Sequence, residues 1–312
     1  MVTCSIVIPC YNAGRFLGEA LASIAAQSRP AAEVVVVDDG STDDSAALAE
    51  RAGPPVRVIR QANQGESVAR NVGLRAAGGD YVLFLDADDL LASESIARLG
   101  AAVAGRPGTV AVMGSALFTD DPGTPFETHL PRHDSFFPGI IETNFGPPHC
   151  WLVPRALALE VGGFREDLQH SEDWEFWGRL ALADADLVAV PYAGALYRRH
   201  PGSQVATSSK PAIFLGRLKV AEAMASGLLA RPALLARHGE TMFWSLWTMY
   251  RQSRDSGVAS AELREAERLL GRLAAEGPRA LRRSTFAVMV RAIGVPAAHR
   301  LRGAWLGSAA KP

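Results

Sequence analysis

The sequence predicts an α/β fold with a mostly parallel central sheet flanked by helices, followed by an all-helical extension. Three observations support this prediction. Short apolar runs alternate with helical patterns four times in the first hundred residues, and these runs lack the polar alternation of half-exposed strands. No strand pattern reappears after residue 205, where helical patterns follow one another between Pro232, Gly257, Pro278 and Pro296.

The apolar runs of the first hundred residues predict four strands, at residues 3–9, 33–37, 56–59 and 81–85. Helical spacing predicts four helices: one over residues 15–27, one that follows the Ser/Thr/Asp cluster at 38–44 and ends at about residue 52, one through residues 69–77, and one that begins near Ser93. Further on we expect strands at 109–117 and 150–153, a short helix after Pro154, a helix over 171–182, and two closing strands at 187–190 and 195–198. The intervening residues 118–148, rich in Pro, Gly, Asp and His, predict a long irregular segment, which in a compact domain is usually functional or mobile.

The bulk composition limits the classes of protein to consider. With 312 residues and 48% apolar content, the chain can bury one large core, or one core and a smaller appendage. No apolar stretch is long enough to cross a bilayer and no signal peptide precedes the first strand, so we expect a cytoplasmic protein. The three cysteines lack metal-type spacing. The net charge of −1 hides an asymmetry: residues 1–210 carry 16 Lys and Arg against 26 acids, and residues 211–312 carry 16 against 7.

Three carboxylates follow the fourth predicted strand, in the segment Asp86-Ala87-Asp88-Asp89. In open α/β sheets ligands bind beyond the carboxyl ends of the strands. Clustered carboxylates there repel one another unless a cation or a shared proton offsets them, so Asp86 and Asp88 indicate a metal and diphosphate site. The alternative is that these acids only cap the helix that begins near Ser93.

Several nucleotide-binding classes lack their sequence signature here. No G-x-G-x-x-G follows the first strand and no Walker A sequence occurs, which disfavours a dinucleotide dehydrogenase or a P-loop enzyme. A sugar-phosphate nucleotidyltransferase would need a glycine-rich, basic loop after the first strand, and Cys10-Tyr11-Asn12 does not provide one.

Five short motifs together resemble family 2 glycosyltransferases of the GT-A fold: SIVIPCYN at 5–12, VDDGSTD at 37–43, NQGESVARNVGL at 63–74, FLDADD at 84–89 and SED at 171–173. The resemblance covers about the first 205 residues. It implies a GT-A catalytic domain at 1–205, with a nucleotide-binding part at about 1–117 and an acceptor part at about 118–205, and leaves 206–312 as the helical extension. The implied activity is the inverting, metal-dependent transfer of a sugar from a nucleotide diphosphate sugar, in particular a UDP-sugar, to an acceptor hydroxyl.

The resemblance implies contacts with the donor for eight positions: Pro9, Tyr11, Asn12, Asp39, Gly65, Arg70, Asp86 and Asp88. Tyr11 would stack on the base and Asp39 would accept the N3–H of a uracil. Gly65 permits close approach of the backbone. Arg70 would reach the ribose or Asp39, or else form only local ion pairs, and Asp38 would support the backbone instead. Asp86 would meet the ribose or a metal-bound water.

The same resemblance implies a divalent cation, Mn²⁺ or Mg²⁺, held by Asp88. His200, in the segment Tyr197–Ser203, matches a position where relatives carry a histidine, and an imidazole ligand would favour Mn²⁺ over Mg²⁺. A lone histidine beside a turn is ordinarily structural or solvated, so this alternative stays open.

Inversion in a single displacement needs one general base, and Asp173 matches the base of the family. Ser171 is a natural N-cap, which places Glu172 and Asp173 in the first helical turn, where the helix dipole favours carboxylates. Glu172 is the acceptor-orienting or supporting group. Trp174 and Trp177 are core residues, or Trp174 is a sugar-stacking platform. Without the other motifs, the simpler interpretation would be that Glu172 and Asp173 only stabilise the start of the helix.

Residues 277–312 contain seven Lys and Arg and no acid around an apolar stripe that includes Phe286, Val290 and Trp305. Such a helix can lie in a membrane interface, which would suit a lipid-linked or polysaccharide acceptor, or it can pack on the catalytic domain or a second subunit. The aromatic positions 243–250 indicate an interhelical or homodimer seam. We expect no nucleic-acid partner. The competing reading of the whole chain is a catalytically silent nucleotide-sugar-binding or scaffold protein on the same fold.

Overall fold

The computed structural model describes residues 2–132 and 134–299, and the chain divides into two compact units. The first unit comprises Met1–Gly139, Asn144–Leu168 and Glu172–Thr207, and the second comprises Ile140–Thr143, Gln169–Ser171 and Ser208–Pro312. The two short inserts of the second unit within the first part of the chain have no counterpart in the sequence prediction, which placed a single boundary at residue 205. Among the described residues, no helix has both the length and the apolar character needed to span a membrane.

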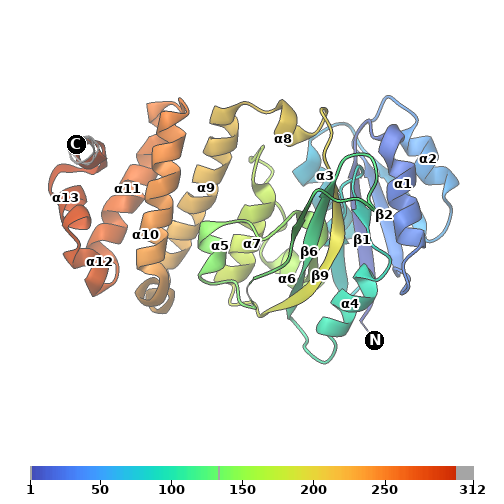
Figure 1. Cartoon of the computed structure of the whole chain (residues 1–312), viewed down its shortest axis with the longest axis horizontal. Coiled ribbons are helices and arrows are strands. Elements are labelled where there is room, and N and C mark those ends of the chain that lie inside the picture. The colour runs from blue at the N-terminus through green and yellow to red at the C-terminus, as the bar shows by residue number, and fades with distance from the viewer. Residues whose placement is uncertain (1, 133, 300–312) are drawn as a thin grey trace. The chain divides into compact units, whose positions relative to one another are not determined.

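The first half of the sheet consists of four parallel strands in the order β3-β2-β1-β4. The neighbouring strands β1 and β2 are labelled in Figure 1. Their bounds confirm the four predicted strands: β1 is Cys4–Cys10, β2 Glu33–Asp38, β3 Val56–Arg60 and β4 Tyr81–Phe84. All residues of β1 and β4 are buried, because helices cover both faces of the sheet there. Consequently the loops after β1, β2 and β4 meet at one edge of the sheet.

Helices connect these strands as predicted: α1 is Gly14–Ala25, α2 Ser45–Arg51, α3 Glu66–Ala76 and α4 Ser95–Ala102. Helix α3 lies close against the sheet because Gly73 has no side chain; a Cβ there would lie 2.2 Å from Cγ1 of Val7. The N-cap residue of α4 is Glu94, and the side chain that accepts from an N–H of its first turn is Gln27, whose Oε1 lies 3.1 Å from the backbone N of Ile96. The alternative in which the acids at 86–89 cap the helix is therefore wrong.

The second half of the sheet continues the order with β8, β6, β9 and β5, and β7 pairs with β6. Strand β8 (Trp151–Pro154) runs antiparallel to both β4 and β6, whereas β6 (Val110–Phe118) and β9 (Leu187–Arg198) are parallel. Strand β5 (Leu90–Leu91) pairs antiparallel with β9. The α/β fold class is confirmed, and the antiparallel pairs are additions that apolar runs do not reveal, since a run has no direction.

The two predicted closing strands are one strand, β9. Its pairing with β6 shifts register near Gly114, where Val190 pairs with Met113 and Ala193 pairs with Gly114. The stretch Pro191-Tyr192-Ala193-Gly194 at this irregularity interrupts the run of β-branched and aliphatic residues, which is why the sequence pattern divided the strand.

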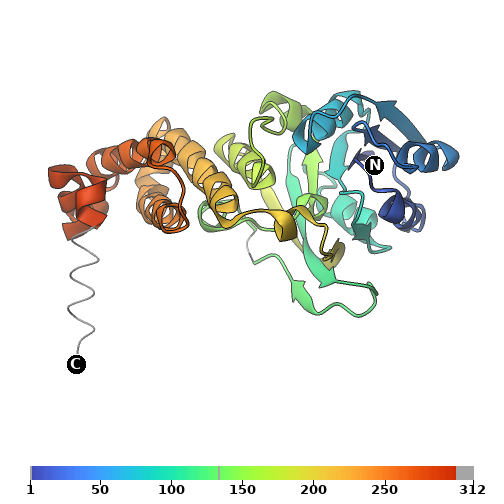
Figure 2. The same ribbon diagram turned by 90° about the horizontal axis from the view of Figure 1, so that it is seen from above.

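The segment 118–148 contains more structure than predicted. Strand β7 (Glu127–His129) forms a hairpin with β6, visible in Figure 2, and α5 spans Gly139–Glu142. A 3₁₀ helix at Pro148–Cys150 leads into β8, α6 (Arg155–Glu160) follows, and α7 spans Glu172–Leu182. The last helix of the first unit is α8 (Gln204–Thr207).

The second unit is helical (Figure 2): α9 is Lys210–Leu229, α10 Pro232–Asp255, α11 Ser260–Glu276, α12 Arg279–Arg283 and α13 Thr285–Ile293. The aromatic positions of α10 form an interhelical seam, since Trp247 lies edge-on to Phe286 of α13 at a centroid distance of 4.6 Å. In the basic tail Leu281 and Val290 are buried, whereas Val288 and Ile293 are exposed. Trp305 lies outside the described residues.

Candidate active site

A cleft of about 500 Å³ opens at the sheet edge where the loops after β1, β2 and β4 meet. Its walls come from five segments that are far apart in sequence: the end of β1 with the start of α1, the residue after β2, the start of α3, the acidic turn after β4 and the segment after β9. The described residues that line it include His200, predicted as a metal ligand, and most of the predicted donor positions: Pro9, Tyr11, Asn12, Asp39, Gly65, Asp86 and Asp88.

Asn12 joins the loops after β1 and β2. It adopts a left-handed backbone conformation with φ of 48°, which asparagine tolerates better than most residues. Its side-chain oxygen accepts a hydrogen bond of 2.8 Å from the backbone N–H of Thr42, and its own N–H donates to Oγ of Ser41 at 3.0 Å. The loop of Tyr11 is therefore held in one conformation, and the Tyr11 side chain stays 54% exposed at the cleft.

Asp39 is almost fully buried and ties the loop between β3 and α3 to the end of β2. Its Oδ1 accepts from the backbone N–H of Gln64 at 2.9 Å and from Nε2 of Gln61 at 2.7 Å, while Oδ2 accepts from the N–H of Gly65 at 2.8 Å. A carboxylate offers about four lone-pair sites, so one acceptor site remains for a ligand in the cleft. Asp38 accepts from the backbone N–H of Ser41, which is the supporting role expected for it.

Asp88 and His200 lie next to each other although 112 positions separate them. Nε2 of His200 is 2.9 Å from Oδ2 of Asp88. Neighbouring ligands of an octahedral Mg²⁺ at about 2.1 Å lie about 3.0 Å apart, so these two atoms have a separation suited to one cation. A carboxylate with an imidazole is a donor set that Mn²⁺ accepts. The residues therefore fit a divalent cation between strand β4 and the segment after β9.

Asp89 and Arg198 keep Asp88 and His200 next to each other. Oδ1 of buried Asp89 accepts from the backbone N–H of Arg198 at 2.7 Å, and Nε of Arg198 donates to the carbonyl oxygen of Asp88 at 2.9 Å. These reciprocal bonds join the acidic turn to the end of β9, two residues before His200. Burial, with Asp88 and Asp86 adding to it, raises the pKa of Asp89 well above its usual range.

A second group of potential ligands, Asp86, Asp89 and His149, has ligand atoms within 4.8 Å of one another. Burial lowers the pKa of His149 to about 4, so its ring is neutral at pH 7. Asp86 lines the cleft, whereas Asp89 and His149 are fully buried and are not among its lining residues.

Arg70 is buried among three carboxylates rather than exposed in the cleft. Its guanidinium donates to Glu66, to Oδ1 of Asp86 at 2.7 Å and to Oε1 of Glu172 at 2.9 Å. Burial opposes the charge of Asp86, but the neighbouring Arg70 outweighs it and lowers the pKa of that carboxyl. Among the described residues, Arg70 forms ion pairs with these three acids and none with Asp39. The arginine instead connects Asp86, in the cleft, to Glu172, at the start of α7.

Asp173 stands beside this network and is not among the described residues that line the cleft. Its Oδ2 accepts a hydrogen bond of 2.7 Å from Nδ2 of Asn144, and Oδ1 accepts from the backbone N–H of Trp174. Burial, with Glu172 adding to it, raises the pKa of Asp173 to about 7. Such a carboxyl can take up a proton near neutral pH, as a general base requires.

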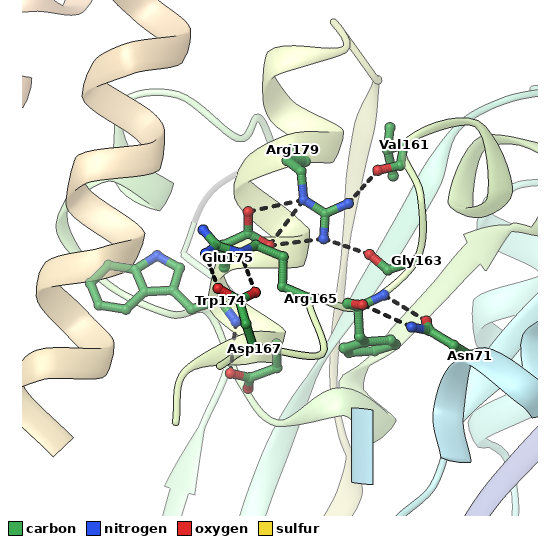
Figure 3. A network of polar contacts seen from close by, with 10 residues as sticks. Asn71, Val161, Gly163, Arg165, Asp167, Trp174, Glu175 and Arg179 are labelled. Carbon is green, nitrogen blue, oxygen red and sulfur yellow. Dashed lines mark hydrogen bonds and ion pairs between the residues drawn. The ribbon is translucent and has the colours of Figure 1, made fainter. Parts of the chain in front are cut away.

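Helix α7 is braced against the turn that precedes it (Figure 3). Arg179 pairs with Glu175 one turn earlier and donates to the carbonyl oxygens of Val161 and Gly163. Asn71, next to Arg70 on α3, accepts from the N–H of Phe164 at 2.7 Å and donates to its carbonyl at 2.8 Å. The same turn is thus attached to both α3 and α7.

The two tryptophans of α7 are both buried. Trp177 stacks on Trp151 of β8 at a centroid distance of 4.5 Å and belongs to the core. Trp174 is 5% exposed, so its ring is not a free platform in this conformation.

Sequence reasoning missed several residues of this region. Asp89 and Asn71 belong to recognised motifs, which was the available signal for them. Asn144 and His149 lie at the end of the 118–148 segment and directly after it, where no motif marked them.

The parallel half-sheet with a cleft at the carboxyl ends of its strands defines an α/β domain of the nucleotide-binding type. The model of the family described as "Glycosyl transferase family 2" matches residues 5–162, and the chain belongs to this family. The recognition made from the five motifs is confirmed.

Curated relatives carry names of the same class. The uncharacterized glycosyltransferase EpsJ of Bacillus subtilis is 31% identical over 227 residues, which are 67% of this chain and 64% of EpsJ. The O-antigen biosynthesis protein RfbC of Myxococcus xanthus is 29% identical over 76% of this chain and 18% of its own length, and YibD of Escherichia coli is 46% identical over 27% and 26%. The chain thus spans less than two thirds of each of these relatives.

Among solved structures, TarS 1-349 of S. aureus in complex with UDP-GlcNAc superposes with a TM-score of 0.70, at 23% identity, over 89% of this chain and 82% of that chain. The likeness shows the fold, so the GT-A fold class predicted from the motifs is confirmed.

Proposed function

We propose that this chain is an inverting glycosyltransferase that moves a sugar from a nucleotide diphosphate sugar, a UDP-sugar, to an acceptor hydroxyl in a single displacement. The observation that carries the proposal is the meeting of Tyr11, Asp39, Asp88 and His200 in one cleft from four separate parts of the chain. Membership of glycosyl transferase family 2 supports it, as does the likeness to TarS, whose crystal structure holds UDP-GlcNAc.

In this proposal the cleft binds the nucleotide. Tyr11 stacks on the base from the exposed loop after β1, and the remaining acceptor site of Asp39 takes the N3–H of the uracil ring. The diphosphate lies toward Asp88 and His200, where a bound Mn²⁺ or Mg²⁺ would neutralise charge that develops on the leaving group. Asp86, held by Arg70, faces the ribose or a metal-bound water.

Asp173 acts as the general base. It takes the proton of the acceptor hydroxyl while the acceptor oxygen forms the new bond to the anomeric carbon, and the bond from that carbon to the diphosphate oxygen breaks. Attack from the face opposite the diphosphate inverts the anomeric carbon. Glu172, paired with Arg70, keeps Asp173 in a negatively charged setting that favours uptake of the proton.

The acceptor in this proposal is a glycan or lipid-linked molecule of cell-surface polysaccharide synthesis. The name of RfbC, an O-antigen biosynthesis protein, supports that class.

The helical unit exposes residues that suit peripheral contact with an anionic membrane surface: Arg282, Arg283, Val288 and Ile293. The double variant Arg282→Glu/Arg283→Glu should bind anionic liposomes more weakly in a flotation assay, at unchanged melting temperature. Unchanged flotation, or dimerisation through this face, would contradict the membrane contact.

The function is tested by a thermal-shift screen of UDP- and GDP-sugars with and without MnCl₂, followed by NMR of the product. A UDP-sugar at about 100 times its dissociation constant should stabilise the protein by about 2.7 kcal/mol, and more with Mn²⁺ than without it. Asp88→Asn should lose the Mn²⁺-dependent part, whereas Asp120→Asn, an exposed acid outside the cleft, should keep it. Donor binding without any transfer to acceptors would instead favour the catalytically silent alternative, and a retained anomeric configuration would exclude single displacement.

A further inference from the structure

The carboxylate of Asp173 is held by a side chain from outside its own helix. Nδ2 of Asn144 donates to Oδ2 at 2.7 Å, and the backbone N–H of Trp174 donates to Oδ1 at 2.7 Å. Each oxygen thus has one fixed donor, and about half of the four lone-pair sites of the carboxylate stay open for a hydroxyl. The plane of the carboxylate is determined by these two bonds.

Packing of the residues after Asn144 determines where that amide lies. The ring of Phe145 stacks on that of Trp151, with centroids 6.0 Å apart and an angle of 5° between the planes. Nε1 of Trp151 donates to the carbonyl oxygen of Gly146 at 3.2 Å, and Trp151 in turn stacks on Trp177 of α7. The loop that carries Asn144 is therefore anchored on the same helix that carries Asp173.

The chemistry of an amide suits this position. Asn144 donates through an N–H that neither gains nor loses a proton between pH 4 and pH 10, so the hydrogen bond favours the ionised carboxylate throughout that range. It opposes the burial and the charge of Glu172, which both raise the pKa of Asp173. A histidine or an acid in its place would change charge with pH.

We infer that Asn144 is a positioning residue for the general base: it holds the Asp173 carboxylate in a single orientation from which the open lone pairs take the proton of the acceptor hydroxyl. This inference rests on the proposed function, in which Asp173 is the base. It goes beyond it by assigning a specific role to Asn144, in a segment that the resemblance placed in the acceptor part without naming any of its residues.

The test uses Asn144→Leu, which preserves the size of the side chain without its donor, in the 312-residue chain. We expect kcat to fall about 10- to 100-fold, since misplacement of a catalytic group has costs of this order, while KM for the donor stays unchanged. The acid limb of the kcat–pH profile should move to higher pH, because loss of the donor disfavours the ionised form. Asn144→Gln, which retains an amide donor, should recover part of kcat and return the profile toward that of the unmodified protein.

The matched readouts separate a positioning role from a structural one. Should Asn144→Leu fold poorly, as judged by its melting temperature, Asn144→Asp takes its place; its like charge beside Asp173 should move the acid limb further to higher pH. If Asp173→Asn is inactive but a folded Asn144 variant keeps the kcat and pH profile of the unmodified protein, the inference is wrong. If Asp173→Asn itself retains activity, the assignment of the base, and with it this inference, is wrong, although donor binding in the cleft would still stand.

Discussion

The cleft beyond β1, β2 and β4 and the surroundings of Asp173 differ in how their side chains are held. In the cleft, Asn12 and Asp39 bind backbone N–H groups of loops that follow neighbouring parallel strands. Around Asp173, the backbone N–H of Trp174 comes from its own helix, but the second donor is the side chain of Asn144 from the segment before β8. The preceding residue Glu172 is in turn paired with Arg70 of α3.

This difference explains which residues a sequence can reveal. Loops after parallel strands need particular residue types at particular spacings to turn and to expose their N–H groups, so their residues form compact motifs. The supports of Asp173 only need a side chain of the right kind to arrive at one point in space. Many sequences satisfy that requirement, so no short pattern marks it.

The largest effect is expected for Asp173→Asn, which changes the proposed general base and leaves the cleft unchanged. An amide cannot accept the proton of the acceptor hydroxyl, so transfer should fall by about 10²- to 10⁴-fold, while UDP binding in the cleft changes little. In the unmodified protein, kcat should rise with pH through about 7, where Asp173 becomes ionised. Joint loss of transfer and UDP binding, measured by initial rates and calorimetry, would show that the two regions are not separable.

Arg70→Met tests the link between the regions. It leaves Glu66, Asp86 and Glu172 without their shared cation, which should cost about 3–5 kcal/mol of the free energy of unfolding at pH 7. The pKa of Asp86 is lowered in the folded state, so the stability from its pair with Arg70 is present above about pH 4 and lost below it. The difference between variant and unmodified protein should therefore shrink on acidification. Arg165→Met, which removes a more exposed pair with Asp167, should cost at most about 1 kcal/mol in the same urea titrations.

Asp88→Ala tests the cleft. If Asp88 is a metal ligand, UDP should bind about 10- to 100-fold more weakly in the presence of Mn²⁺ and almost unchanged with a chelator present. Chelation alone should abolish transfer by the unmodified protein. An equal loss with and without Mn²⁺ in calorimetry would remove Asp88 from the coordination shell and leave its contact with His200 as a structural one.

Tyr11→Ala should have the smallest effect. Loss of an exposed stacking ring should weaken UDP binding by about 0.5–1.5 kcal/mol, or about two- to tenfold, and Tyr11→Phe should leave it unchanged because the ring face remains. Fluorescence titration with UDP measures both. Weakening by the phenylalanine variant alone would mean that the hydroxyl, rather than the ring, contacts the nucleotide.

Much of the fold follows from local pattern. The apolar runs of β1, β2, β3 and β4 and the breaks at Pro232, Gly257 and Pro278 in the helical unit are all visible in the sequence. Burial on both faces, the missing N–H of proline and the positive φ of Gly257 all act within a few residues. The reversed direction of β8 and the continuity of β9 through its irregular register are not visible, since pairing is a property of two distant segments.

For the site, the sequence by itself determined the family, the acidic turn at Asp86–Asp89 and the positions from which Tyr11, Asp39 and His200 reach the cleft, because the loops that end parallel strands impose their own residue types. Only the tertiary structure decided that Arg70 is buried among three acids instead of exposed to the donor, and that Asn144 holds Asp173. Both depend on side chains that meet after the chain has folded, and the free energy of such contacts comes from burial and neighbouring charge, which no single position in a sequence carries.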